Sequence, residues 1–182
     1  MIQVFDNLLP ADFADDIEKR LSHEDMPWYL ISNTVYPGHK AYTESGYKDI
    51  NFMGHLFILN GQVTSDFHIQ MLFDMVNCFK EATNLISKNL YRIRANITFP
   101  TPDPQLPSRR HVDSDTPHQV LLYYVNDSDG DTLLYENDVL VNTVSPKKNR
   151  FVLFDGHHEH CFYSPVKTDK RIVININLKP KE

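Results

Sequence analysis

The chain has 182 residues, of which 41% are hydrophobic and 23% are charged, a composition typical of an ordinary globular protein. The formal net charge of -6 weighs against a nucleic-acid partner or an anionic membrane surface, because both attract basic proteins. No apolar run has membrane-spanning length, the first residues lack the basic segment of a signal peptide, and two cysteines are too few for a disulfide framework. We therefore expect a cytoplasmic protein with one domain over residues 1–182.

Two helices are predicted in the N-terminal part. IQVF at residues 2–5 is typical of a short strand. Residues 10–22 predict a helix, because a proline suits its first turn and apolar side chains recur on one face. Residues 64–87 predict the longest helix of the chain, which Thr64 or Ser65 can cap.

Between these helices, residues 32–55 are rich in Gly, Pro, Ser, Tyr and His, which favours a long irregular segment. Aromatic loops that contain glycine suit the task of covering a substrate, although packing of a long loop would use the same residues. The aromatic residues in and just before this segment are Trp28, Tyr29, Tyr36, Tyr42 and Tyr47.

In the second half of the chain the spacing of apolar side chains changes from near four to two. YRIRANITF at residues 91–99 alternates apolar with polar side chains. We expect the polar side, which carries Arg92 and Arg94, to face solvent, with the mouth of a pocket as the alternative for Arg94. More strands follow at short intervals with turn signals between them. They are QVLLYYVN, TLLYE, VLVNTV, RFVLF and RIVININL.

LLYENDVLV predicts a hairpin with a tight turn at Asn137-Asp138. Many short strands preceded by helices favour a sandwich or barrel with the helices packed on one side. The predicted fold is therefore mainly β: a helical or irregular part at residues 1–89 and a jelly-roll core at residues 90–178.

Histidines and one carboxylate in the core suggest a metal site. HVDSD places His111 and Asp113 two residues apart, so both side chains project to the same side of an extended chain. Two imidazoles and one carboxylate on one side of an ion are typical of non-haem Fe(II) oxygenases. A third ligand would come from FDGHHEH, where strand parity leaves both His158 and His160 as candidates. Arg171, which opens the last predicted strand, is a further charged candidate.

Two stretches together resemble a known enzyme core. RRHVDSDTPHQVLLYYVNDSDGDTLLYEN and NRFVLFDGHHEHCFYSPVKTDKRIVININL are similar to the core of Fe(II)/2-oxoglutarate-dependent oxygenases, most of all to small prolyl 4-hydroxylase-like proteins such as those of phages. The resemblance covers roughly residues 90–178. It implies a double-stranded β-helix of the cupin-like, jelly-roll type, one Fe(II), and 2-oxoglutarate and O2 as cosubstrates.

The resemblance also implies roles for single residues. His111, Asp113 and His160 match the iron ligands of the family, and Arg171 matches the residue that pairs with the C5 carboxylate of 2-oxoglutarate. Tyr124 matches a tyrosine that donates its hydroxyl to the same carboxylate. Three residues fall where relatives line the cosubstrate pocket: Asn96, Thr132 and Asn175.

The sequence departs from the family pattern in one place, since Asp129-Gly130 stands where Gly-Gly is usual. With His160 as the ligand, we expect His157 and His158 at the mouth of the site or at the surface, with a position beside the metal ligands as the alternative. For His118 we expect a surface position, with a contact to a ligand residue or to the substrate as the alternative.

Three functions remain open on the sequence alone. The resemblance favours a dioxygenase that hydroxylates a prolyl or other residue of a peptide or protein. An oxygenase acting on a small molecule is an alternative, and so is a cupin-like metal-binding module with its metal on His158 and His160. Arg171 favours an oxygenase, because a cupin-like module needs no partner for a cosubstrate carboxylate at that position.

Overall fold

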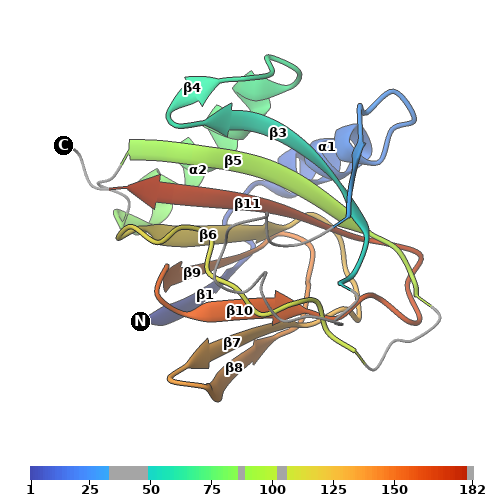
Figure 1. Ribbon diagram of the computed structural model, residues 1–182. Coiled ribbons are helices and arrows are strands. Elements are labelled where there is room, and N and C mark those ends of the chain that lie inside the picture. Colours follow the sequence, from blue (N-terminus) through green and yellow to red (C-terminus); the bar gives the residue numbers. More distant parts are fainter. Residues whose placement is uncertain (33–48, 86–88, 102–105, 180–182) are drawn as a thin grey trace.

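The larger of two antiparallel sheets has eight strands in the order β1-β9-β6-β11-β5-β3-β2, with β4 paired to β3, and the smaller has the order β10-β7-β8 (Figure 1). The computed structural model describes residues 1–32, 49–85, 89–101 and 106–179. The strands are β1 (Ile2–Asp6), β2 (Tyr29–Ile31), β3 (Phe52–Leu59), β4 (Gln62–Val63), β5 (Asn89–Thr98), β6 (Gln119–Tyr124), β7 (Thr132–Glu136), β8 (Val139–Val144), β9 (Arg150–Asp155), β10 (Glu159–Phe162) and β11 (Arg171–Lys179).

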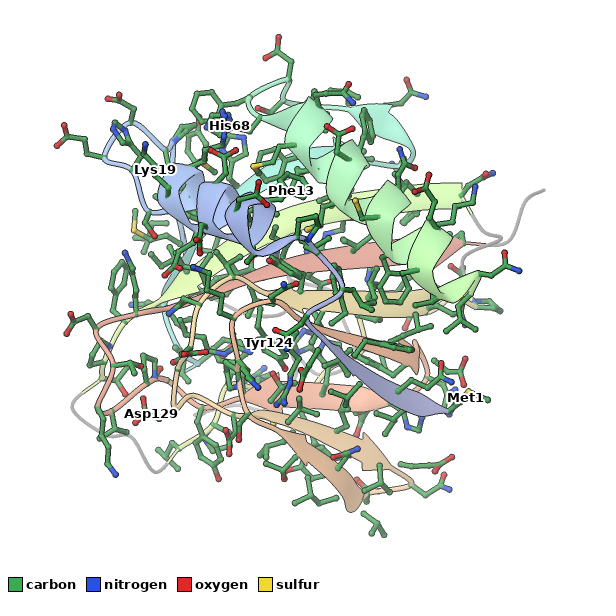
Figure 2. The ribbon with its side chains drawn as sticks, turned by 180° about the vertical axis from the view of Figure 1, so that it is seen from behind. Met1, Phe13, Lys19, His68, Tyr124 and Asp129 are labelled. Atoms are coloured by element: carbon green, nitrogen blue, oxygen red, sulfur yellow. The ribbon has the colours of Figure 1, made fainter. Side chains whose placement is uncertain are left out.

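Two helices, α1 (Ala11–Leu21) and α2 (Ile69–Thr83), cover one face of the larger sheet (Figure 2). The ring of Phe79 from α2 lies between those of Phe5 and Phe151, with centroid distances of 5.4 and 4.9 Å. The core on this side also includes Ile17, Leu21, Leu72, Met75, Ile93, Ala95, Ile97, Ile172, Ile174 and Ile176. Within the described part of the chain, neither helix is long and apolar enough to cross a membrane.

The opposite face of the larger sheet packs against the smaller sheet. This second core consists of Val120, Leu122, Tyr124, Leu134, Val144, Val152, Phe154 and Val173. β6 and β9 are buried on both faces, which explains why their sequences are almost continuously apolar. β11 is also buried on both faces, but Asn175 and Asn177 interrupt its apolar residues. The polar residues of β5 and β11 lie on this second face, between the two sheets, where they form the walls of a site.

The mainly β architecture with N-terminal helices packed on one side is confirmed. Each predicted strand is present, and the predicted hairpin joins β7 to β8, with Glu136 paired to Val139. Asn137 and Asp138 have φ angles of 49° and 65°, as a two-residue turn of this kind requires.

The predicted start of the second helix is wrong. α2 begins at Ile69, and no side chain caps it. Thr64 Oγ1 donates instead to the Leu56 carbonyl at 3.0 Å, and Ser65 Oγ contacts Nε2 of His55 at 2.8 Å. Both candidate caps therefore bond to β3, which the sequence analysis did not predict.

The predicted irregular segment at 32–55 is also wrong at its end, because β3 begins at Phe52. Residues 33–48, with three of the candidate covering tyrosines, lie outside the described residues. The Asn60-Gly61 turn between β3 and β4, with φ angles of 52° and 74°, is a hairpin signal that could have revealed these strands.

Candidate metal and cosubstrate site

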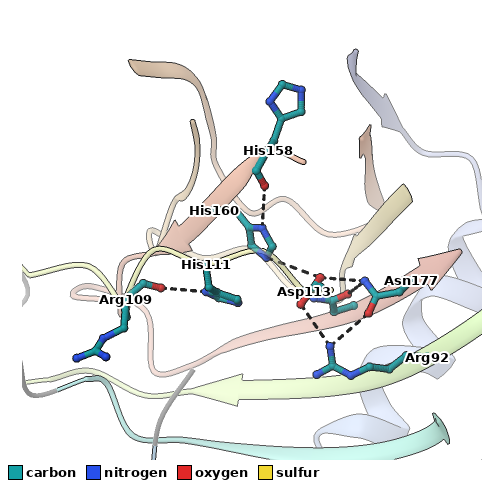
Figure 3. A network of polar contacts seen from close by, with 8 residues as sticks. Arg92, Arg109, His111, Asp113, His158, His160 and Asn177 are labelled. Carbon is teal, nitrogen blue, oxygen red and sulfur yellow. Dashed lines mark hydrogen bonds and ion pairs between the residues drawn. The ribbon is translucent and has the colours of Figure 1, made fainter. Parts of the chain in front are cut away.

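The backbones of His111 and His160 pair with each other outside the regular ladders, and Figure 3 shows their side chains together with that of Asp113. The His111 N–H donates to the His160 carbonyl at 3.1 Å, and the His160 N–H donates to the His111 carbonyl at 2.8 Å. This bridge places the centroids of the two buried imidazole rings 4.6 Å apart. Oδ2 of Asp113 lies 3.8 Å from Nε2 of His160. One possible ligand atom from each of the three residues lies within 4.8 Å of the other two.

In both imidazoles, the free lone pair is on Nε2. Nδ1 of His111 lies 2.9 Å from the Arg109 carbonyl, and Nδ1 of His160 lies 3.4 Å from the His158 carbonyl. A carbonyl only accepts, so each Nδ1 carries the hydrogen. Burial, and secondly the proximity of His160, lowers the pKa of His111 to about 4. Burial also lowers the pKa of His160, so both rings are neutral at pH 7.

Asp113 is held by three donors. Its Oδ2 accepts from Nδ2 of Asn175 at 3.0 Å and from Nδ2 of Asn177 at 2.9 Å, and Oδ1 accepts from Arg92 at 3.3 Å. Burial alone would raise the pKa of Asp113, but His160, Arg92 and the other neighbours outweigh it and hold the pKa far below the usual range. A carboxylate with two neutral imidazoles is the protonation state in which such residues bind a metal ion.

A pocket lies next to these three residues, between the two sheets, and we call it the site pocket. Its walls carry two arginines, one from β5 and one from β11, and an aromatic pair. The lining residues are Phe52, Arg94, Asn96, His111, Leu122, Thr132, His160, Cys161, Phe162, Arg171, Val173 and Asn175.

Arg171 enters the pocket from the start of β11 and is buried. Its Nε donates to the Gly130 carbonyl at 2.8 Å, and one terminal nitrogen donates to Thr132 Oγ1 at 2.8 Å. A Cβ on Gly130 would lie 3.0 Å from Arg171 Cδ and 2.5 Å from the Tyr163 carbonyl, so a larger residue does not fit there. Among the described residues no carboxylate pairs with Arg171, which leaves its charge for an anion in the pocket.

The predicted pocket residues take two kinds of position. Asn96, Thr132 and Asn175 line the site pocket, and Asn175 also bonds to Asp113. Tyr124 lies one layer behind, because its hydroxyl donates to Thr132 Oγ1 at 2.7 Å and its side chain is fully buried. A direct contact between Tyr124 and a cosubstrate stays a prediction.

The favoured expectation that the polar side of β5 faces solvent is wrong, and the alternative for Arg94, a position at the pocket, agrees with the structure. Arg92 bonds to Asp113, and Arg94 lines the site pocket. Sequence reasoning also missed Asn177 as a partner of Asp113. Strand parity could have found it, because Asn177 is two residues beyond Asn175 in the alternating stretch RIVININL.

The other histidines divide between the surface and the interior. His157 is 60% exposed, as expected. The favoured surface position is wrong for His158 and His118, which are only 3% and 6% exposed, whereas the alternative for His158, a position beside a metal ligand, agrees with the structure. His158 has two roles: its carbonyl orients His160, and its ring belongs to a second group of possible ligands with Glu136 and His157. The structure thus groups His160 with His111 and Asp113 rather than with the His158 ring.

Comparisons with known proteins connect this site to a fold. No family model and no curated protein matches the sequence. Solved structures do match: a 2OG-Fe(II) oxygenase family oxidoreductase from Burkholderia pseudomallei has a TM-score of 0.73 at 9% identity, over 98% of this chain and 84% of that one.

Two further matches differ in what they act on. A prolyl hydroxylase from Trichoplax adhaerens, in complex with a hypoxia inducible factor peptide fragment, has a TM-score of 0.63 at 18% identity, over 97% of this chain and 82% of that one. A non-heme alpha ketoglutarate dependent epimerase from nogalamycin biosynthesis has a TM-score of 0.62 at 12% identity, over 98% of this chain and 77% of that one. The chain therefore has the jelly-roll fold of the 2-oxoglutarate and Fe(II)-dependent oxygenases.

Proposed function

We propose that the protein is a single-domain dioxygenase that uses Fe(II), 2-oxoglutarate and O2 to hydroxylate a substrate, releasing succinate and CO2. The observation that carries this proposal is the group of His111, Asp113 and His160 beside a pocket whose wall also holds the buried guanidinium of Arg171, with which no described carboxylate pairs. The two cysteines of the protein are free thiols, which accords with a location in the cytoplasm.

The donor set fits an Fe(II) ion. Two neutral imidazoles and one carboxylate would hold the ion and cancel half of the charge of Fe(II), and three protein ligands would leave coordination positions for cosubstrates. When bound, iron with 2-oxoglutarate and O2 supplies the oxidising chemistry that a side chain cannot. The chain's own part is to fix the ligands: the Arg109 and His158 carbonyls orient the two rings, while Asn175 and Asn177 orient the carboxylate.

Arg171 and Thr132 fit the far carboxylate of 2-oxoglutarate. A carboxylate buried without a partner costs several kcal/mol, and a planar guanidinium can pair with both of its oxygens. Thr132 Oγ1 already accepts from Tyr124 and Arg171, so its own hydrogen is left to donate to that carboxylate. In this arrangement Tyr124 acts through Thr132.

The substrate is proposed to be a prolyl or other residue of a peptide or protein, or alternatively a small molecule. The peptide is favoured by the sequence resemblance and by the prolyl hydroxylase among the structural matches. The match to the epimerase from nogalamycin biosynthesis is the reason for retaining a small molecule as the alternative.

The test is binding and turnover of 2-oxoglutarate. Protein with Fe(II) is expected to turn 2-oxoglutarate into succinate in air, measured by NMR, and protein with Mn(II) to bind 2-oxoglutarate without O2. Arg171→Met should abolish both, while Arg20→Met, on the exposed surface of α1, should change neither. A wild-type protein that binds no 2-oxoglutarate, or an Arg171→Met variant that binds it normally, would show the proposal to be wrong.

A further inference from the structure

Arg94 is a second guanidinium in the site pocket, separated from Arg171 by an aromatic pair. Its Cζ lies 5.3 Å from the ring centroid of Phe52, and Cζ of Arg171 lies 4.9 Å from that of Phe162. The two rings meet edge to face, with 6.3 Å between their centroids. Because one guanidinium suffices for the far carboxylate of 2-oxoglutarate, the charge of Arg94 is left over for another ligand.

Among the residues that the structure describes, none serves Arg94 as a counterion of its own. Its Nε is buried and has no hydrogen-bond acceptor, and it forms no ion pair with any residue that the structure describes. The carboxylate that acts on it is Asp113, which is already bonded to Arg92 and Asn175. Burial, helped by the charge of Arg92, lowers the pKa of Arg94 to about 9, still above neutral pH. A buried charge in this state is costly until an anion joins it.

Asn96 presents an unpaired acceptor beside this unpaired donor. It follows Arg94 by two residues on β5, so both side chains project from the same face of the strand. Its Oδ1 is buried and has no donor among the described residues. Gly54 lies against it, since a Cβ there would be 3.3 Å from Asn96 Oδ1. This wall of the pocket is therefore complementary to a ligand that carries both an anionic group and a hydrogen-bond donor.

The need for both a negative charge and a hydrogen-bond donor favours some anions over others. A phosphate would turn oxygens toward Asn96 Oδ1, which repels them, and it would bring more negative charge than one guanidinium balances. A carboxylate carries one charge and pairs with a guanidinium through two parallel hydrogen bonds. In an amino acid or a peptide, an N–H lies a few bonds away from such a carboxylate.

We propose that Arg94 and Asn96 form the substrate subsite of the pocket: the substrate is an amino-acid unit, free or within a peptide, whose carboxylate pairs with Arg94 and whose N–H donates to Asn96. This inference rests on the proposed dioxygenase function, because that function pairs the far carboxylate of 2-oxoglutarate with Arg171 and so leaves Arg94 for the substrate.

The test compares carboxylates with their amides. Protein loaded with Mn(II) and 2-oxoglutarate without O2 is titrated calorimetrically with two matched pairs. L-proline and L-prolinamide probe a free amino acid, while N-acetyl-L-glutamate methylamide and N-acetyl-L-glutamine methylamide probe a side chain in a peptide. One carboxylate is expected to bind at least about tenfold more tightly than its amide. Arg94→Met should weaken it by about 30-fold or more, the loss typical of truncating a buried charge pair.

The controls separate this site from the cosubstrate site. Arg94→Met should leave the affinity for 2-oxoglutarate unchanged, Arg94→Lys should recover part of the carboxylate affinity, and Arg20→Met should behave as wild type. Without ligands, Arg94→Met should unfold at a higher temperature than wild type, because it removes an unpaired buried charge. This also shows that the variant folds.

Two results would overturn the inference: wild-type protein that binds neither carboxylate better than its amide, or an Arg94→Met variant that loses 2-oxoglutarate instead. A failure of the proposed function looks different. It appears as normal 2-oxoglutarate binding in Arg171→Met, or as none in wild type, and the carboxylate pairs are then compared on protein with Mn(II) alone.

Discussion

His158 and His160 lie two residues apart, but their rings have different surroundings. Nε2 of His160 faces Asp113, whereas Nδ1 of His158 donates to the Tyr135 carbonyl at 3.3 Å. His160→Ala is therefore expected to lose Fe(II) binding, with a loss beyond the roughly 10–100-fold typical of residues that only orient ligands. His158→Ala should stay within about that range, because the backbone carbonyl that orients His160 remains.

Anaerobic titration with Fe(II) measures both variants, and His23→Ala, on an exposed loop, serves as the surface control. Retention of iron in His160→Ala together with its loss in His158→Ala would mean that the metal belongs to the group of Glu136, His157 and His158.

The sequence could identify part of this site at the level of single residues. His111 and Asp113 were found because the two-residue period of an extended chain is a local property. The choice between His158 and His160 was not local, since parity allowed both and only the family resemblance favoured His160. In the structure it depends on the backbone bridge between His111 and His160, which joins distant segments.

The loop before β11 is organised by Asp129, where the oxygenase pattern has a glycine. Its carboxylate accepts from the N–H groups of Val166 at 3.1 Å, Lys167 at 2.8 Å and Thr168 at 3.3 Å. Burial opposes ionisation, but these bonds outweigh it and lower the pKa of Asp129 to about 2. The departure from the family pattern therefore fixes the loop that leads into Arg171.

Asp129→Asn is expected to lower the free energy of unfolding by about 2 kcal/mol at pH 7, because an amide oxygen accepts these bonds less strongly than a carboxylate. A group whose pKa is lowered by folding stabilises the protein fully above its unfolded pKa, near 4, and loses that contribution as the pH falls. The difference between wild type and variant should thus persist down to about pH 4 and shrink toward pH 2.

Urea unfolding across this pH range measures the difference, with Asp25→Asn, at a carboxylate whose side chain is 82% exposed, as the control. A gap of constant size at every pH would show that the charge of Asp129 contributes nothing.

At the level of elements, periodicity predicted the strands of the core but not what each face meets. β5 alternates apolar and polar residues as a half-exposed strand does, yet its polar face carries Arg92, which is bonded to Asp113, and Arg94, which lines the site pocket. Alternation reports polarity, and a polar face inside a pocket has the same pattern as a polar face in water. The wrong helix cap has a related cause. Thr64 and Ser65 bond to β3, and the local sequence pattern does not reveal tertiary contacts of this kind.

In the whole molecule, the site joins the two sheets. Asp113 is bonded to Asn175 and Asn177 of β11 in the larger sheet, while His160 belongs to β10 in the smaller sheet. A metal ion held by both would therefore link the sheets across the second core. In the unfolded chain these ligands lie far apart, so the binding energy of the metal adds to the stability of the fold.

Mn(II) at about 100 times its Kd should therefore raise the free energy of unfolding by about 2.7 kcal/mol. For a domain of this size that corresponds to an increase in Tm of roughly 5–10 °C. 2-Oxoglutarate should add a further increase only when the metal is present, because in the proposed function the ion would supply part of its binding site. His111→Ala should abolish both increases, and Arg171→Met should keep the first and lose the second. Equal stabilisation by 2-oxoglutarate with and without Mn(II) would mean that its site is independent of the metal, and the proposed chemistry would then have no basis.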